Sequence, residues 1–166
     1  EEPLLELIEG ARWDLEDRPV ATLEDLVDYS NLVGGSVGAM MLPFLVGGDR
    51  HPTLEPAART LGIAMQITNI VRDVGEDART LERVYLPTQW LDRYGVHPAD
   101  LTGGALPEGY PRLLEDVMQA AEARYEESFA GINALPWKVR FSIRAAARMY
   151  REIMNEVRAN RYDNLN

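Results

Sequence analysis

Apolar residues recur every three or four positions along most of the chain, and no segment shows the strict alternation of a half-buried strand. This pattern predicts five extended helices and one short helix. We place them at residues 4–16, 23–46, 54–77, 88–94, 110–130 and 137–160. Such helices, packed antiparallel, form a bundle that can hold a site between facing helices. The sequence therefore predicts an all-α helical bundle.

Residues at the helix ends sharpen these boundaries. Thr22, followed three positions later by Asp25, resembles a capping box, and Thr53 is expected to cap the helix that follows it. Gly95 should end the short helix, and the glycine-rich stretch 100–109 should form a surface loop. In the first helix the apolar positions gather near one face: Leu4, Leu5, Ile8, Ala11 and Leu15.

Residues 29–48 carry no charge over 20 positions, which is long enough to span a bilayer. The stretch also contains five glycines and Pro43, and it is preceded by an acidic residue, Asp28, where a membrane helix usually has Lys or Arg. A helix that is apolar on all sides is otherwise buried in a core. We therefore expect a buried helix, kinked before Pro43, in preference to a transmembrane helix.

Composition narrows the function classes. A chain of 166 residues with 46% apolar residues suits one domain with its own core. The net charge of -10 argues against nucleic acid as a partner, although a divalent cation would still allow an anionic substrate. The absence of cysteine excludes disulfides, zinc–thiolate sites and thiol nucleophiles. The acidic first residues do not form a secretion signal, so we expect a cytoplasmic protein.

Four oxygen-bearing side chains form a stripe on the predicted helix 54–77. Gln66, Asn69, Asp73 and Asp77 are spaced by three, four and four residues, and at 100° per residue they fall within an arc of about 80°. Two carboxylates one turn apart repel unless a cation lies between them, and Mg²⁺ or Mn²⁺ suits such ligands. The alternative is a solvated helix end with salt bridges to arginines. The two amides on the same stripe favour a site.

The predicted helix 23–46 contains Gly34, Gly35 and Gly38 in its interior. Each helical glycine costs about 1 kcal/mol relative to alanine. Three within five residues need a structural reason. Either a neighbouring helix packs very closely there, or a ligand occupies the space that side chains would fill.

At these stretches the sequence resembles the squalene and phytoene synthase family. The family's small-residue helix is similar to residues 29–38, which read YSNLVGGSVG, and its aspartate-rich motif is matched without a break by residues 66–77, QITNIVRDVGED. Residues 83–87, RVYLP, match a third motif, except that Glu82 stands where the family has glycine. Residues 147–153 are similar to the family's C-terminal helix.

The resemblance implies an isoprenoid-synthase-like fold and the Mg²⁺-dependent, head-to-head condensation of two prenyl diphosphates. The implied product is phytoene, made from geranylgeranyl diphosphate through a cyclopropyl diphosphate. The implied catalytic residues are Asp73, Asp77 and Tyr29, and the implied metal ligands are Asn69, Asp73 and Asp77. The implied substrate-binding residues are Gln66, Arg72, Tyr150, Val33, Gly34, Gly38 and Arg83.

Family members carry two aspartate-rich motifs, and only the second is found here. We therefore expect residues 1–166 to be a single partial domain, incomplete at the N-terminus and corresponding to two thirds or less of the family domain. Alone, such a fragment is expected to be inactive.

Several alternatives stay open at this stage. One is a squalene or dehydrosqualene synthase that uses farnesyl diphosphate, with NADPH as reductant only for squalene. A second is a terpene cyclase or a chain-elongating prenyltransferase, although their motifs are spaced differently. A third is a non-catalytic relative that assembles proteins or binds lipids. Because the hydrocarbon product would be insoluble, we expect peripheral contact with a membrane, although the sequence shows no basic amphipathic helix to mark the docking surface. The oligomeric state is not predicted.

Overall fold

A computed structural model describes residues 1–48 and 51–166. The described residues form helices and connecting turns without any strand, which confirms the predicted all-α bundle. The elements are α1 (Glu2–Leu15), α2 (Leu23–Ser30), η1 (Asn31–Gly35), α3 (Ser36–Val46), α4 (Glu55–Thr80), α5 (Thr88–Tyr94), η2 (Pro98–Thr102), α6 (Tyr110–Ile132) and α7 (Trp137–Ala159).

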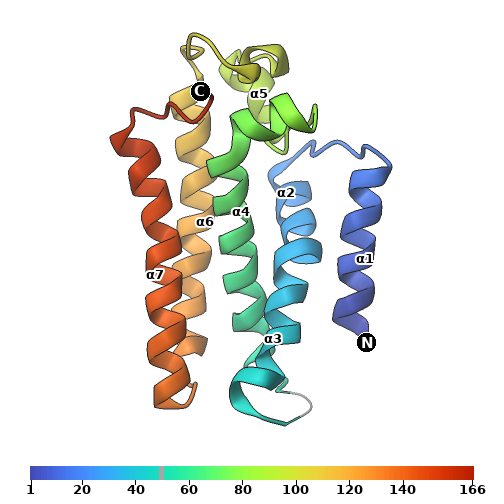
Figure 1. Cartoon of the computed structure of the whole chain (residues 1–166), viewed down its shortest axis with the longest axis vertical. Coiled ribbons are helices and arrows are strands. Elements are labelled where there is room, and N and C mark those ends of the chain that lie inside the picture. The colour runs from blue at the N-terminus through green and yellow to red at the C-terminus, as the bar shows by residue number, and fades with distance from the viewer. Residues whose placement is uncertain (49–50) are drawn as a thin grey trace.

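Helix α4 is the centre of the bundle. It packs against α6 and α7 on one side and against α2, η1 and α3 on the other, while α1 lies outside the α2–α3 column (Figure 1). The turns around α5 and η2 cover one end of the bundle, and the end of α3 and the α6–α7 connection lie at the other end (Figure 1). Because α4 packs against α2, α3, α6 and α7, and Arg59 of α4 also pairs with Glu6 of α1, a side chain on α4 can face several different neighbours.

The core follows from the apolar stripes of α4 and α6. Fully buried residues include Ile67 and Val71 of α4 and Leu114 of α6. One buried polar pair joins the two helices, because the hydroxyl oxygens of Thr68 and Tyr125 lie 3.0 Å apart. The Thr68 hydroxyl also donates to a backbone carbonyl of its own helix, so neither hydroxyl is buried without a partner.

Most predicted boundaries agree with the structure to within a few residues. Thr22 and Asp25 form the predicted capping box, the helix Thr88–Tyr94 has the predicted bounds, and Gly95 ends it in a left-handed conformation with φ of 64°. The prediction that Thr53 caps α4 is wrong. A turn closed by the His51 carbonyl precedes α4, which makes Leu54 its N-cap without any side-chain cap.

The predicted single helix 23–46 is divided by a π-helical turn, η1. The amide of Ser36 donates to the carbonyl of Asn31, five residues back, and the side chain of Asn31 occupies the space where a Cβ on Gly35 would lie. Pro43 lies inside α3 and does not end it. Single π-turns of this kind often occur at functional sites.

This α2–α3 stretch is long and apolar enough to cross a membrane by length and composition alone. In the bundle it packs against α1 and α4 instead, with Leu26, Tyr29 and Leu42 buried. Only 33% of the most apolar window is buried, and Phe44 is 83% exposed, so the expectation of a buried helix is met only in part.

The apolar face predicted for α1 is left uncovered by the described residues. Leu4, Leu5, Ile8 and Leu15 are 51–86% exposed, whereas Gly10 and Trp13 make the inward contacts. A Cβ on Gly10 would lie 2.8 Å from Cγ2 of Val33, so the absence of a side chain lets α1 approach the α2–α3 column.

The glycines of η1 and α3 allow the backbone of these elements to touch that of α4. A Cβ on Gly34 would lie 2.4 Å from the carbonyl oxygen of Gly62, and a Cβ on Gly62 would lie 2.2 Å from that of Gly34. A Cβ on Gly38 would lie 2.3 Å from the Ala58 carbonyl oxygen. Close helix packing is therefore one reason for these glycines.

The contact between Gly34 and Gly62 makes the substitution Gly62→Ala a test of the η1–α4 packing. Alanine would gain about 1 kcal/mol in helix propensity, but its methyl group would meet backbone atoms that cannot rotate away. We expect a net loss of about 2 kcal/mol in the free energy of unfolding, seen as a fall of about 4–8 °C in Tm. In the control Gly10→Ala the methyl group meets the end of the Val33 side chain, which can rotate, and Tm should change less. Equal falls for the two variants would contradict the proposed packing.

Candidate active site

The oxygen-bearing stripe of α4 lies between two adjoining cavities. A polar cavity of about 270 Å³ is lined by Asp73 and Asp77, among others. An apolar cavity of about 370 Å³ extends from it along α4. Gln66 and Asn69 line both cavities. The two amides therefore lie at the boundary between the cavities, where the polar head of an amphipathic ligand would join its apolar tail.

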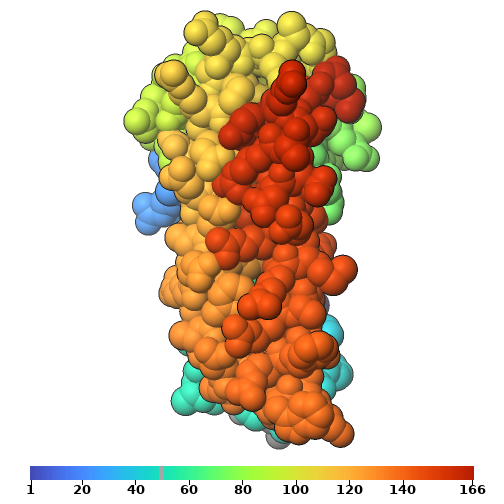
Figure 2. Space-filling view, turned by 90° about the vertical axis from the view of Figure 1, so that its left-hand side faces the viewer, coloured from blue at the N-terminus to red at the C-terminus, as the bar shows by residue number. Residues whose placement is uncertain are grey.

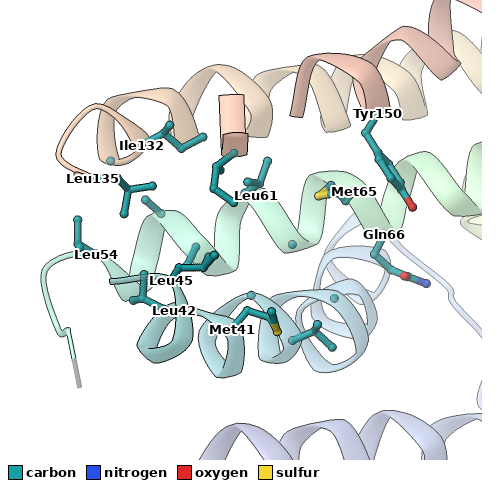
Figure 3. A pocket seen from close by; sticks show the side chains of 18 of the residues that line it. Met41, Leu42, Leu45, Leu54, Leu61, Met65, Gln66, Ile132, Leu135 and Tyr150 are labelled. Atoms are coloured by element: carbon teal, nitrogen blue, oxygen red, sulfur yellow. The ribbon is translucent and has the colours of Figure 1, made fainter. Parts of the chain in front are cut away.

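The apolar cavity lies between α3, α4 and the facing parts of α6 and α7 (Figure 3). The α4 residues that line it run from Ala57 to Asn69, twelve positions or about 18 Å at 1.5 Å per residue. Its far end is formed by Leu45, Leu54 and Leu135 (Figure 3). A narrow apolar space of this length suits an extended hydrocarbon chain.

The predicted wall residues Val33, Gly34 and Gly38 all line the apolar cavity. The glycines therefore combine the two explanations that the sequence left open, because they allow close helix contact and also border empty space. Tyr150 of α7 lines the same cavity from the opposite side, with its ring directed toward Gln66 (Figure 3).

The amide oxygen of Asn69, Oδ1, is buried without a hydrogen-bond donor among the described residues. A buried polar atom without a partner costs about 1–3 kcal/mol, so such an atom at the junction of two cavities is well placed to receive a ligand or a cation.

Asp73 is paired with its neighbour. The Arg72 guanidinium donates two hydrogen bonds of 2.6 Å to the two carboxylate oxygens of Asp73, and it also interacts with Tyr150, so that together these contacts raise the pKa of Arg72. Arg72 and Asp73 both line the polar cavity. If Asp73 binds a cation, Arg72 is released beside the incoming anion, where its planar fork can contact diphosphate oxygens.

Asp77 lies one turn further along α4 and lacks such a partner. Partial burial, followed by the negative charges of Asp73 and Glu76, raises its pKa to about 6. A cation between Asp73 and Asp77 would remove this repulsion.

The donor set fits a hard divalent cation. Among residues 1–48 and 51–166 no group of three or more His, Cys, Asp or Glu side chains is arranged to hold a metal ion. Two carboxylates and one amide oxygen are nevertheless sufficient for Mg²⁺, which keeps several waters and takes substrate phosphates as its other ligands. Asn69, Asp73 and Asp77 would be the residues of this chain that hold it.

Tyr29 lines the polar cavity and not the apolar one. Its ring stacks on that of Tyr85 with centroids 5.1 Å apart, and its edge meets Trp13. Burial, together with Tyr85 and Asp14, raises the pKa of Tyr29 well above its usual value of 10. The phenol therefore stays protonated, and the ring is held in place by packing on two sides.

Sequence reasoning missed Asp14, which organises this aromatic pair. The hydroxyls of Tyr29 and Tyr85 donate to different oxygens of the Asp14 carboxylate, at 3.2 and 3.1 Å. Asp14 lies on α1, 15 residues before Tyr29 and 71 before Tyr85. No local spacing could have signalled this contact.

Arg83 is the predicted substrate-binding residue that lines neither of the two cavities. Its guanidinium binds the backbone carbonyl of Asp14 and lies 3.4 Å from a carboxylate oxygen of Asp17, above the ring of Tyr85. In this structure it therefore joins α1 to the turn after α4, beside the polar cavity.

Comparisons with known proteins agree with this geometry. The family model described as squalene/phytoene synthase matches residues 1–166. The chain is 42% identical over 165 residues to a phytoene synthase of Thermus thermophilus, covering 99% of the chain and 55% of the relative. It is 39% identical over 160 residues to a phytoene synthase of Rhodobacter capsulatus, covering 96% of the chain and 46% of the relative. The chain thus spans about half the length of these curated relatives.

The fold is also similar to solved structures. A crystal structure of a dehydrosqualene synthase in complex with ligand superposes with a TM-score of 0.89 at 37% identity, over 99% of the chain and 58% of that structure. A squalene synthase from Alicyclobacillus acidocaldarius, at 24% identity and a TM-score of 0.87 over 97% of the chain and 60% of that structure, shares the fold.

Proposed function

From the premise that this chain belongs to the squalene/phytoene synthase family, we propose that the protein condenses two prenyl diphosphates head to head. The observation that carries the proposal is the junction at Gln66 and Asn69, where a polar, acidic cavity meets an apolar one. A prenyl diphosphate has the same two-part chemistry. Its diphosphate would lie beside Asp73 and Asp77, and its hydrocarbon chain would extend toward Leu54 and Leu135.

Mg²⁺, or Mn²⁺ in its place, would supply positive charge to the departing diphosphate. The residues of the chain contribute the rest. Asn69, Asp73 and Asp77 would hold the ion, and Arg72, once freed from Asp73, would contact diphosphate oxygens together with Gln66. Tyr29 and Tyr150 would border the reacting end of the substrate, where an aromatic face can stabilise a carbocation.

The apolar cavity would protect that carbocation. Its walls are aliphatic side chains and glycines, with polar groups only at the junction and at Tyr150. Such a wall offers no nucleophile and keeps water away from the reacting carbon atoms. These features favour catalysis over a role as a non-catalytic lipid-binding relative, which would not need the acidic stripe.

We propose geranylgeranyl diphosphate as substrate and phytoene as product, because the two relatives compared above are phytoene synthases. The structural similarity to a dehydrosqualene synthase keeps farnesyl diphosphate as the second candidate. NADPH would be needed only for squalene. We further propose a cytoplasmic protein in which the first aspartate-rich motif of the family, which residues 1–166 do not contain, completes the site, so that residues 1–166 alone are inactive.

The test is an incubation of the full-length gene product with labelled C15 and C20 diphosphates. Each should be supplied with Mg²⁺, with EDTA, and with or without NADPH. We expect Mg²⁺-dependent consumption of the C20 substrate and a C40 hydrocarbon product that does not require NADPH, and no turnover by residues 1–166 alone. If neither substrate is consumed in the presence of Mg²⁺, the proposed function is wrong.

A further inference from the structure

The first half of α7 is strongly basic, in contrast to the rest of the chain. Residues 128–151 include five Lys or Arg and no Asp or Glu, although the whole chain has a net charge of -10. The basic residues are Lys138, Arg140, Arg144, Arg148 and Arg151. No basic amphipathic helix was identified from the sequence, and this segment of α7 was overlooked there.

Three of these cations are engaged within the bundle. Arg151 pairs with Glu126 of α6, and Arg140 and Arg144 donate to the backbone and side-chain oxygens of Asn133. The other two are available. Arg148 has no hydrogen bond or ion pair with the described residues, and the ammonium of Lys138 lies 5.6 Å from the centroid of the Trp137 ring.

Large apolar side chains stand beside these cations. Trp137 is 68% exposed and Phe141 is 75% exposed. Together with Arg140, Arg144 and Arg148 they border a shallow groove on the outer face of α7. Figure 2 shows α7 on the outside of the molecule, with an outward side that no other helix of the described residues covers. We call Trp137, Lys138, Phe141, Arg144 and Arg148 the α7 basic surface.

The α7 basic surface lies close to the far end of the apolar cavity. Leu135, which closes the cavity, stands two residues before Trp137, and Ile143 lines the cavity from the inner face of the same helix. Phe44, at the end of α3, is 83% exposed, and the end of α3 and the start of α7 lie at the same end of the bundle (Figure 1).

We propose that the α7 basic surface docks the protein on an anionic lipid bilayer. Cations attract the negative surface of such a membrane, while exposed Trp and Phe side chains enter its interfacial layer. The remainder of the protein is acidic and would be repelled by the anionic lipid. Salt screens this repulsion beyond about 10 Å, so the protein can bind the membrane with its basic face while the acidic faces stay out of range. The contrast between this basic face and the acidic remainder of the chain, whose net charge is -10, is what favours an anionic lipid surface.

This docking would place the end of the apolar cavity lined by Leu135 near the bilayer, where a hydrocarbon product is soluble. That benefit rests on the proposed function, but the docking itself rests only on the composition and exposure of α7. Vesicle binding can be measured without turnover, so a failure of the docking proposal and a failure of the proposed function are distinguishable.

The experiment is flotation of the full-length gene product with vesicles of phosphatidylcholine, with and without about 30% phosphatidylglycerol. We expect binding only to the anionic vesicles, and its loss at high salt. Removing one cation near the surface should weaken binding about fivefold, so the double variant Lys138→Gln, Arg148→Gln should bind about 25-fold more weakly. Anionic vesicles should also shift the fluorescence of the wild type to shorter wavelength, and Trp137→Phe should remove that shift.

The matched control is the double variant Arg93→Gln, Arg112→Gln, which removes two exposed cations from α5 and the start of α6 at the other end of the bundle. It should bind like the wild type, and circular dichroism should show both double variants folded. Equal binding to neutral and anionic vesicles, or equal losses in the two double variants, would overturn the proposal. A third result would also overturn it: no binding to vesicles, together with a dimer that buries Trp137 and that the Lys138→Gln, Arg148→Gln variant dissociates.

Discussion

Replacing Asp73 by Asn in the full-length protein should reduce kcat/KM by about 10³-fold while leaving the fold intact. The variant keeps the size of the side chain but removes the negative charge that would hold the cation. A bound metal ion contributes several kcal/mol to stabilising the departing charge, and a loss of about 4 kcal/mol corresponds to this factor. Because Asp73 and Arg72 are both partly exposed, their lost ion pair should change Tm by only a few degrees.

The matched control is Glu76→Gln. Glu76 lies on the same part of α4, but it is exposed and lines neither cavity, so its charge is near the site without being in it. We expect this variant to keep activity within a few-fold and to bind Mn²⁺, followed by electron paramagnetic resonance, as the wild type does. If Asp73→Asn retained both Mn²⁺ binding and turnover, the assignment of the α4 stripe as a metal site would be wrong.

The α4 stripe was predictable from the sequence because all its members lie on one helix. Helical periodicity fixes the relative directions of Gln66, Asn69, Asp73 and Asp77 without any knowledge of the fold. The apolar neighbours of the stripe also indicated that it borders on buried surface. Helical periodicity could not place Tyr150 across the gap, because Tyr150 reaches the cavity from α7, about 80 residues later. Its place in the site was predicted from the family resemblance alone.

Contacts between distant segments explain most of what was missed. Asp14 joins Tyr29 and Tyr85, and Arg83 joins α1 to the turn after α4; both depend on how α1 docks on the bundle. The π-turn η1 was missed for a different reason. It is a local departure from α-helical hydrogen bonding, in which the Asn31 side chain lies where a Cβ of Gly35 would be, and hydrophobic periodicity does not detect such a feature.

The depth of the apolar cavity gives the proposed enzyme a physical basis for choosing its substrate. If the polar cavity holds the diphosphate as proposed, the length of the hydrocarbon chain would be limited by Leu45, Leu54 and Leu135 at the far end of the apolar cavity. A C20 chain reaches further from the diphosphate than a C15 chain does. A larger side chain at the far end should therefore act against the longer substrate more strongly than against the shorter one.

The substitution Leu45→Trp tests this argument, because it fills the far end from α3 without touching the α4 stripe (Figure 3). Excluding an apolar group that no longer fits costs about 1–3 kcal/mol, so the ratio of kcat/KM for C20 over C15 diphosphate should fall about 10- to 100-fold. The neighbouring substitution Phe44→Trp is the control, since Phe44 points outward, is 83% exposed and should leave the ratio unchanged. If Leu45→Trp lowered both activities by the same factor, chain length would have to be selected elsewhere in the protein.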